Sequence, residues 1–139
     1  MPVLFVPKKD RKRRMVQDYH YVNKGTIKNS YPLPLISELI DSMGTKKVFT
    51  KMDLRWGYNN VRIKEEDEWK TAFTTYLGLF EPTIMYFGLT NSPATFQAMI
   101  NDLFRDIINK GDMATFIDNI LVATETEEGH DDIVEEVLR

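Results

Sequence analysis

The chain has 139 residues, of which 42% are hydrophobic and 28% are charged, and it contains no cysteine. This composition is ordinary for a globular protein, and the lack of cysteine excludes disulfides, zinc–thiolate sites and thiol chemistry. No apolar run approaches about 18 residues, and the N-terminus places its apolar stretch before its basic residues, unlike a secretory signal. We therefore expect an intracellular protein that does not enter a membrane.

The net charge of −3 conceals a strong asymmetry along the sequence. Residues 1–64 carry 14 basic and 5 acidic side chains, whereas residues 65–139 carry 4 and 16. Six of the seven residues from Lys8 to Arg14 are basic. Such a segment is either a solvated hairpin turn or a contact for a polyanion such as nucleic acid, and one segment can be both.

The first half of the sequence predicts short strands separated by irregular segments. Residues 2–9 form a β-like run, and residues 14–24 predict a second strand that leads into a loop. Two prolines then exclude a helix, and the short helix after them can end at Gly44. Residues 47–54 predict a further strand, which residues 60–63 would continue or pair with.

The middle of the sequence predicts two strands and one long helix. The strands cover residues 70–76 and 79–87, around Gly78. A continuous apolar stripe at helical spacing predicts a helix over 93–110, which Gly111 would end. The side chains expected to be buried along this stripe are Phe96, Ile100, Leu103, Phe104 and Ile107.

The last part of the sequence predicts a hairpin followed by a helix. Residues 113–117 and 120–123 would be its strands, and Asp118-Asn119 is a turn-prone pair between them. The final helix begins near Thr126 and has no stop signal, which suggests a chain cut from a longer protein.

Two aspartates differ from the other acidic residues because each adjoins an apolar strand. Asp53 ends the strand over 47–54, and Asp118 lies at the turn of the predicted hairpin. A carboxylate at the edge of a core is costly unless it is paired, hydrogen-bonded or bound to a cation. Brought together, the two would offer the oxygen ligands that hard divalent ions prefer. A turn aspartate and a capping aspartate would explain the same spacing without a metal site.

The order of several motifs resembles the fingers and palm of reverse transcriptases, specifically the gypsy-type class of LTR retrotransposons. The matching segments are Arg14–Tyr19, Val22–Lys24, Tyr31–Pro34, Phe49–Tyr58, Thr71–Phe73, Phe87–Gln97 and Phe116–Asn119. The resemblance implies an α+β fold, in which the palm is an antiparallel sheet with helices packed on one face, together with partial fingers. Residues 1–139 would be a single unit, about 1–46 fingers-like and 47–139 palm with a fingers insertion, without thumb, connection or ribonuclease H.

The activity implied by this resemblance is RNA-directed DNA polymerisation, a nucleotidyl transfer. Two Mg²⁺ or Mn²⁺ ions assist attack of a primer 3′-hydroxyl on the α-phosphate of a deoxynucleoside triphosphate in this family. Asp53, Asp118 and the backbone carbonyl of Leu54 would hold the metal. The partners would be an RNA or DNA primer–template and the incoming nucleotide, and a second copy of the chain could cover the surface left by the missing thumb.

Basic residues near the N-terminus match phosphate-binding positions of the family. Lys9 and Arg14 would contact the phosphates of the incoming nucleotide, Arg14 with the planar fork that suits phosphate. Lys8, Lys12 and Arg13 would contact the template backbone through a sequence-independent, salt-dependent attraction.

Four further positions match the nucleotide pocket of the family. Trp56 and Gly57 would offer backbone N–H groups to the triphosphate. Tyr58 would be the steric gate that excludes ribonucleotides. Phe87 stands where the gypsy-type class usually has an aromatic residue, and it would pack near the nucleotide. Turn geometry for Gly57 and core packing for Tyr58 and Phe87 are the alternative interpretations.

Asn119 departs from the family pattern of an aromatic residue, any residue and two aspartates. Asparagine offers a carbonyl oxygen but no charge, so the catalytic positions are Asp53, Asp118 and the degenerate Asn119, with two carboxylates instead of three. The first hypothesis is therefore a reverse transcriptase fragment that is inactive or weak as it stands. The alternative is a domesticated, non-catalytic remnant that binds nucleic acid or another protein.

Overall fold

The computed structural model describes residues 1–8 and 11–139, and the contacts within the chain divide it into two compact units. Unit 1 consists of residues 1–29 and 58–92, and unit 2 of residues 30–57 and 93–139. Each unit therefore combines two segments that are separated in the sequence by the other unit. Lys9, a predicted phosphate contact, lies outside the described residues.

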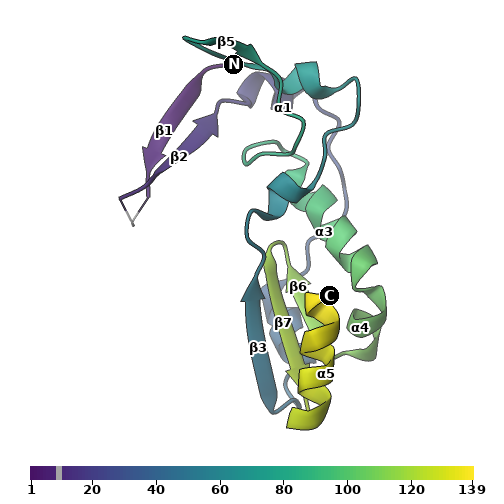
Figure 1. The fold of residues 1–139 in the computed structure, drawn as a ribbon. Helices are drawn as coiled ribbons and strands as arrows, with labels where there is room; N and C mark the ends of the chain where they lie inside the picture. Colours follow the sequence, from purple (N-terminus) through teal and green to yellow (C-terminus); the bar gives the residue numbers. More distant parts are fainter. Residues whose placement is uncertain (9–10) are drawn as a thin grey trace. The chain divides into compact units, whose positions relative to one another are not determined.

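Unit 1 is built on two β-hairpins (Figure 1). The first hairpin pairs β1 (Val3–Pro7) with β2 (Arg13–Gln17), as the sequence predicts, and the second pairs β4 (Phe73–Thr75) with β5 (Gly78–Phe80). The edges of β1 and β4 adjoin, because the Thr74 N–H donates to the Met1 carbonyl at 3.1 Å. The predicted strand over 14–24 is too long: β2 ends at Gln17, and helix α1 (His20–Gly25) occupies the rest of that segment.

The strands of the second hairpin are shorter than predicted. The chain turns at Tyr76 and Leu77 instead of at Gly78, and the predicted strand over 79–87 stops at Phe80. Pro82 explains the stop, because proline cannot donate to a ladder hydrogen bond. The predicted pairing of residues 60–63 with the strand over 47–54 is wrong, since they pair with residues 83–85.

Two polar side chains at the end of β2 and just after it are buried in unit 1. Gln17 is 4% exposed and Tyr19 is 2% exposed, and within the described residues neither the Gln17 carboxamide nor the Tyr19 hydroxyl has a hydrogen-bond partner. Burial raises the pKa of Tyr19 to about 12. Gly88, at φ 103°, lies against the Tyr19 ring, which a side chain at that position would meet at 3.3 Å.

Unit 2 is a three-stranded antiparallel sheet with helices on it. The strands are β3 (Val48–Asp53), β6 (Met113–Phe116) and β7 (Asn119–Thr124), in the order β3-β7-β6. The helices are α2 (Ile36–Ser42), α3 (Ser92–Leu103), α4 (Arg105–Lys110) and α5 (Glu127–Leu138). Short 3-10 turns at Gly57–Asn60 and Glu68–Thr71 complete the regular structure of the two units.

Side chains that alternate along β7 point to opposite faces of the unit 2 sheet. Ile120 and Val122, with Met113, pack against Ile107 of α4 and the apolar residues of α5, so these helices cover one face as predicted. The opposite face carries a smaller cluster, in which Met43, just after α2, packs on Ala114 and Ala123. No helix in the described part of the chain has both the length and the apolar character needed to cross a bilayer.

The predicted continuous helix over 93–110 is wrong, because it breaks at Phe104. The backbone of Phe104 has φ −107° and ψ 22°, which separates α3 from α4. Phe96, Ile100 and Ile107 are buried as expected, but Leu103 is 68% exposed. Leu103 ends α3 beside a hollow that it shares with the C-terminal end of α5, and the break leaves its side chain in solvent.

The two leucine-sized side chains on either side of this break should respond differently to truncation. Leu103→Ala is expected to change the free energy of unfolding by less than about 0.5 kcal/mol, as exposed positions do. Ile107→Ala, at 4% exposure, should cost about 2–5 kcal/mol. Chemical denaturation of both variants measures the difference, and equal losses would show that Leu103 is buried in solution.

Candidate active site

Two strand ends of unit 2 place the first candidate catalytic positions opposite one another. Asp53 ends β3 and is the register partner of Asn119, which begins β7. The Leu54 N–H donates to the Asp118 carbonyl at 2.7 Å, so the Asp53–Asn119 pair lies between ladder hydrogen bonds. Side chains of such non-hydrogen-bonded pairs lie closest together, with Cβ atoms about 4.5–5.5 Å apart. Asp53 and Asn119 therefore share one face, directly across the two strands.

The two carboxylates have different surroundings. The Asp53 side chain is 73% exposed, and the Lys51 Nζ lies 3.7 Å from its Oδ1 on the same face of β3. An exposed pair of this kind contributes little to stability, so the lysine can give way to another cation. Asp118 is half-buried, and its Oδ1 accepts a hydrogen bond from the Asn119 amide at 3.1 Å. Asn119 therefore adds no charge of its own, but its amide stabilises the charge of the neighbouring Asp118 carboxylate.

The chemistry of these donors fits a hard divalent ion. The two carboxylates, with the Leu54 carbonyl next in the chain to Asp53, supply the oxygen ligands that Mg²⁺ prefers. Across the described residues, no three or more His, Cys, Asp or Glu side chains gather to hold a metal. The assignment of the metal ligands stays a prediction.

The turn that carries Asp118 differs from the predicted one. The strands end at Phe116 and resume at Asn119, so the turn residues are Ile117 and Asp118 instead of Asp118 and Asn119. Ile117 has φ 54°, in the left-handed region that a β-branched residue rarely adopts. A positive φ at the first turn residue alone is typical of a type II′ turn, which usually has glycine there. Because the sequence has Ile117 and not glycine at this position, it carries no signal for a turn that begins at Ile117.

The segment after Asp53 packs tightly under the turn. A side chain on Gly57 would meet the Phe96 ring at 3.0 Å and the Asp118 Cβ at 3.3 Å, so only glycine fits without displacement. Trp56 precedes it with φ 59° and is 64% exposed. Packing against Phe96 and Asp118 therefore gives a steric reason for glycine at position 57, and the role of its backbone N–H stays a prediction.

Three of the predicted nucleotide-binding side chains gather within unit 1. The Arg14 guanidinium lies 5.0 Å from the centre of the Phe87 ring, and the Tyr58 ring meets Phe87 edge-on at 4.9 Å. A cation over an aromatic face and an edge-to-face pair are both favourable contacts. The structure therefore joins positions that are up to 73 residues apart in sequence into one cluster, Arg14–Phe87–Tyr58.

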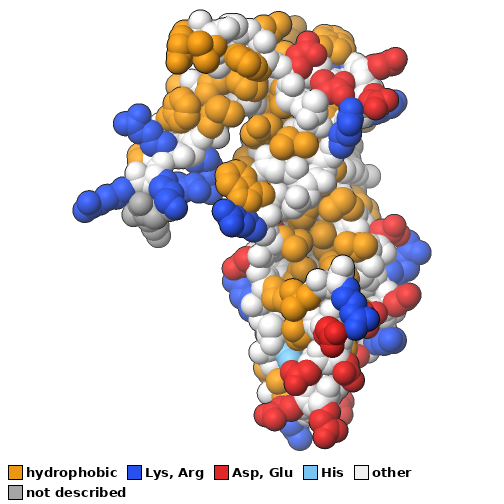
Figure 2. Space-filling model, in the orientation of Figure 1, with side chains coloured by type: hydrophobic (Ala, Val, Ile, Leu, Met, Phe, Trp, Pro, Cys, Tyr) orange, Lys and Arg blue, Asp and Glu red, His pale blue; other side chains and the backbone are white. Residues whose placement is uncertain are grey.

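The predicted template contacts lie at the turn end of the β1–β2 hairpin, where Figure 2 shows lysine and arginine side chains gathered. Lys8, Lys12 and Arg13 are exposed. Arg13 and Arg14 are neighbours in β2, so their side chains project to opposite faces of the hairpin. The face with Arg14 adjoins Phe87, and the face with Arg13 also carries Met15, so one hairpin can serve two different contacts.

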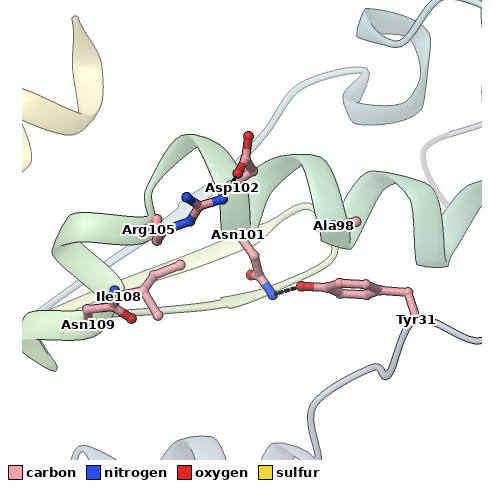
Figure 3. A pocket seen from close by; sticks show the side chains of 7 residues that line it. All are labelled: Tyr31, Ala98, Asn101, Asp102, Arg105, Ile108 and Asn109. Atoms are coloured by element: carbon pink, nitrogen blue, oxygen red, sulfur yellow. Dashed lines mark hydrogen bonds and ion pairs between the residues drawn. The ribbon is translucent and has the colours of Figure 1, made fainter.

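A polar network behind the Asp118 turn was not predicted from the sequence. Its members are Gln97, Asn101, Thr115 and Tyr31. Figure 3 shows its outer part, in which the Asn101 amide donates to the Tyr31 hydroxyl at 2.9 Å. Gln97 and Asn101 are four residues apart, beside the apolar stripe of α3. A polar pair at that spacing next to a buried stripe is the signal that could have revealed the network.

The antiparallel sheet of unit 2 thus presents two aspartates at adjoining strand ends. Residues 6–139 match the family model described as reverse transcriptase (RNA-dependent DNA polymerase). The chain therefore belongs to the reverse transcriptase family, whose members use divalent metal ions. Its α+β fold is a reverse transcriptase palm with partial fingers.

Curated relatives and solved structures agree with this family. The chain is 39% identical to the Transposon Tf2-7 and Tf2-8 polyproteins of Schizosaccharomyces pombe over 138 residues, 99% of this chain and 10% of each relative. It is 32% identical to foamy viral protease-reverse transcriptase in complex with an RNA/DNA hybrid, with a TM-score of 0.86 over 98% of this chain and 18% of that one. The foamy viral protease-reverse transcriptase dRH in complex with double-stranded DNA gives a TM-score of 0.88, with 24% of that chain covered. The chain thus spans about a tenth of the curated relatives it matches.

Proposed function

We propose that the chain is the fingers and palm part of a gypsy-type retrotransposon reverse transcriptase, with unit 1 as the fingers and unit 2 as the palm. The observation that carries this proposal is the pairing of Asp53 with Asn119, which sets Asp118 beside the end of β3. The identity with the Tf2 polyproteins supports the gypsy-type class, and the foamy viral complexes support a primer–template as the partner.

In this proposal Asp53, Asp118 and the Leu54 carbonyl would hold the divalent ions. Two such ions would supply activation of a primer 3′-hydroxyl and charge neutralisation at the triphosphate. The protein's own residues position the substrates. Arg14, held over the Phe87 ring, keeps its guanidinium fork available for the nucleotide phosphates.

Tyr58 would discriminate between sugars in the same cluster. Its edge contact with Phe87 restrains the ring, and a restrained ring is a more selective barrier to a ribose 2′-hydroxyl than a mobile one. The backbone N–H groups of Trp56 and Gly57, which follow Asp53, would bind the triphosphate as donors.

Asn119 sets the expected level of activity. With two carboxylates instead of three, the site stabilises the charge that develops during phosphoryl transfer less well. We expect no or very weak extension of a primed RNA template by the unmodified chain, and measurable nucleotide addition by the Asn119→Asp variant.

A primer-extension assay with deoxynucleotides tests this function. The unmodified chain, Asn119→Asp, and Asn119→Asp combined with Asp53→Asn are compared at equal concentrations in Mg²⁺ and in Mn²⁺. Addition by the first variant that disappears with Asp53→Asn supports the proposal. No addition and no primer–template binding by any of them would contradict it. Extension by the unmodified chain at rates typical of polymerases would show that the Asn119 carbonyl suffices.

Nucleic-acid binding should depend on the basic turn of the β1–β2 hairpin. Neutralising Lys9, Lys12 and Arg13 together is expected to weaken primer–template binding and to flatten its dependence on salt, by about 0.9 in the log–log slope for each phosphate that the protein no longer neutralises. Titrations at several salt concentrations measure the slope. Neutralising Lys47, Lys110 and Arg139 is the matched control. An unchanged slope in the first variant would place the binding surface elsewhere.

A further inference from the structure

We propose that Gln97 is a positioning residue that holds the turn at Ile117 and Asp118 in its strained shape. The inference deepens the proposed function, since it rests on that function and assigns to α3 the task of placing Asp118 and Asn119. It starts from a side chain that is fully buried and uses both ends of its carboxamide on the hairpin.

The Gln97 carboxamide contacts the hairpin on both sides of Phe116. Its Oε1 accepts the Ile117 N–H at 2.7 Å. Its Nε2 donates to the Thr115 hydroxyl at 2.9 Å and lies 3.3 Å from the Thr115 carbonyl. A single side chain on a helix thus fixes the end of β6 and the first residue of the tight turn.

The orientation of this carboxamide is itself determined by its neighbours. Gln97 also donates to Asn101 Oδ1 at 2.9 Å, and the same oxygen accepts the Thr115 hydroxyl at 2.7 Å. Asn101 can turn its oxygen inward because its amide donates outward to the Tyr31 hydroxyl (Figure 3). Gln97 and Thr115 are buried and Asn101 and Tyr31 half-buried, each of the four side chains has a partner, and a satisfied polar network of this kind is rigid.

The backbone at Ile117 needs such support. A β-branched residue at φ 54° persists only where the surrounding structure over-determines it. The Ile117 N–H donates to Gln97 of α3, and the carbonyl of the next residue, Asp118, accepts the N–H of Leu54, which directly follows β3. Both turn residues are therefore held by hydrogen bonds. The bond to Leu54 joins two backbone groups, whereas the bond to Gln97 uses a side chain and can be removed by substitution.

The test replaces Gln97 by methionine, which keeps the length of the side chain and removes both hydrogen-bonding ends. Amide hydrogen exchange is measured at Ile117 and, as a reference for global opening, at Val122 in the core. We expect Gln97→Met to raise exchange at Ile117 about tenfold more than at Val122, as the loss of one buried hydrogen bond predicts. Mn²⁺ affinity should fall about tenfold, as is usual when a group that orients metal ligands is lost.

Two matched variants separate positioning from stability. Gln17→Met makes the same change at a glutamine that is buried in unit 1 with its carboxamide unpaired among the described residues, and it should leave Ile117 exchange and Mn²⁺ affinity unchanged. Thr115→Val removes a network hydroxyl but keeps the acceptor of the Ile117 N–H, so it should raise exchange at Ile117 and Val122 together. Equal rises at both amides in Gln97→Met would overturn the inference, because they would show a purely structural role.

A rescue experiment covers the case in which Gln97→Met folds poorly. Glycine adopts positive φ without cost, so Ile117→Gly should relieve the strain that Gln97 opposes. In the Ile117→Gly background, Gln97→Met should therefore no longer cause its roughly tenfold loss of Mn²⁺ affinity. Additive effects of the two substitutions would contradict the proposal. If the unmodified chain binds no Mn²⁺, the proposed function fails. Amide exchange then still decides the role of Gln97: the exchange at residue 117, relative to that at Val122, is compared in Ile117→Gly with and without Gln97→Met.

Discussion

Replacing Asn119 by aspartate is expected to tighten Mn²⁺ binding about tenfold, which corresponds to about 1.4 kcal/mol. The new carboxylate would stand directly across from Asp53, on the face where a bound ion would also meet Asp118. One added unit charge about 4–5 Å from a cation is worth several kcal/mol at low effective dielectric, but Asp53 is exposed and solvent screens most of this gain. Calorimetric titration of both proteins at about pH 8 measures the change.

The same substitution should destabilise the chain when no cation is present. Like charges directly opposite in a sheet repel, and this repulsion raises the pKa of the new carboxyl in the folded state. A carboxyl whose folded pKa lies above its unfolded value costs stability at neutral pH, and the cost disappears as the pH falls below both values. Thermal melts of Asn119→Asp should therefore improve relative to the unmodified chain on going from about pH 8 to about pH 4, and on adding Mn²⁺ at the higher pH.

A control variant distinguishes the site from general charge effects. Asn109→Asp adds the same charge on the exposed surface of α4, and it should affect neither Mn²⁺ affinity nor the response of stability to Mn²⁺. Equal behaviour of the two variants would contradict a cation site at Asp53 and Asp118.

Phe96→Ala is expected to cost about 3–5 kcal/mol of unfolding free energy, the largest stability effect among the changes considered. The ring is 1% exposed and lies against the Gly57 backbone under the Asp118 turn. A loss of this size is a large fraction of the roughly 5–15 kcal/mol that stabilises a typical domain. Denaturant titration measures it, and a loss below about 1 kcal/mol would show that the neighbouring residues collapse into the space.

Gly57→Ala tests the same contact from the other side. Its methyl group would push against Phe96 and Asp118, at an expected cost of about 1–3 kcal/mol. Combining it with Phe96→Leu should cost less than the sum, because the smaller side chain leaves room. Gly129→Ala is the matched control: its methyl would meet only Thr126 Oγ1, at 3.5 Å, and in helix α5 alanine should stabilise by about 0.5–1 kcal/mol.

The sequence predicts much of the fold because hydrophobic spacing determines local structure. The two hairpins that flank the basic turn and the Asp118 turn, the strand that ends at Asp53, and the final helix after Thr126 all follow from that spacing. The break at Phe104 does not, because the apolar stripe continues through it. The exposure of Leu103, which belongs to that stripe, could not be predicted for the same reason.

Part of the candidate site can be predicted from the local sequence pattern, and part of it cannot. Asp53 and Asp118 are conspicuous because each interrupts or ends an apolar strand. The strain at Ile117 and the support from Gln97 are not, because both depend on contacts between residues 20 positions apart. The register that sets Asp53 opposite Asn119 is likewise a property of the paired strands and not of either strand alone.

The alternation of the chain between its two units has a consequence for how the protein is made. Asp53 leaves the ribosome about 65 residues before Asp118. In the described sheet β3 pairs only with β7, which follows Asp118 in the sequence. At roughly 5–20 residues per second, β3 waits several seconds for its partner strand. During that interval a strand rich in apolar residues has an unpaired edge, while residues 58–92 complete the other unit. Nascent-chain folding should therefore finish unit 1 first, and the two aspartates should meet only when the β6–β7 hairpin has emerged.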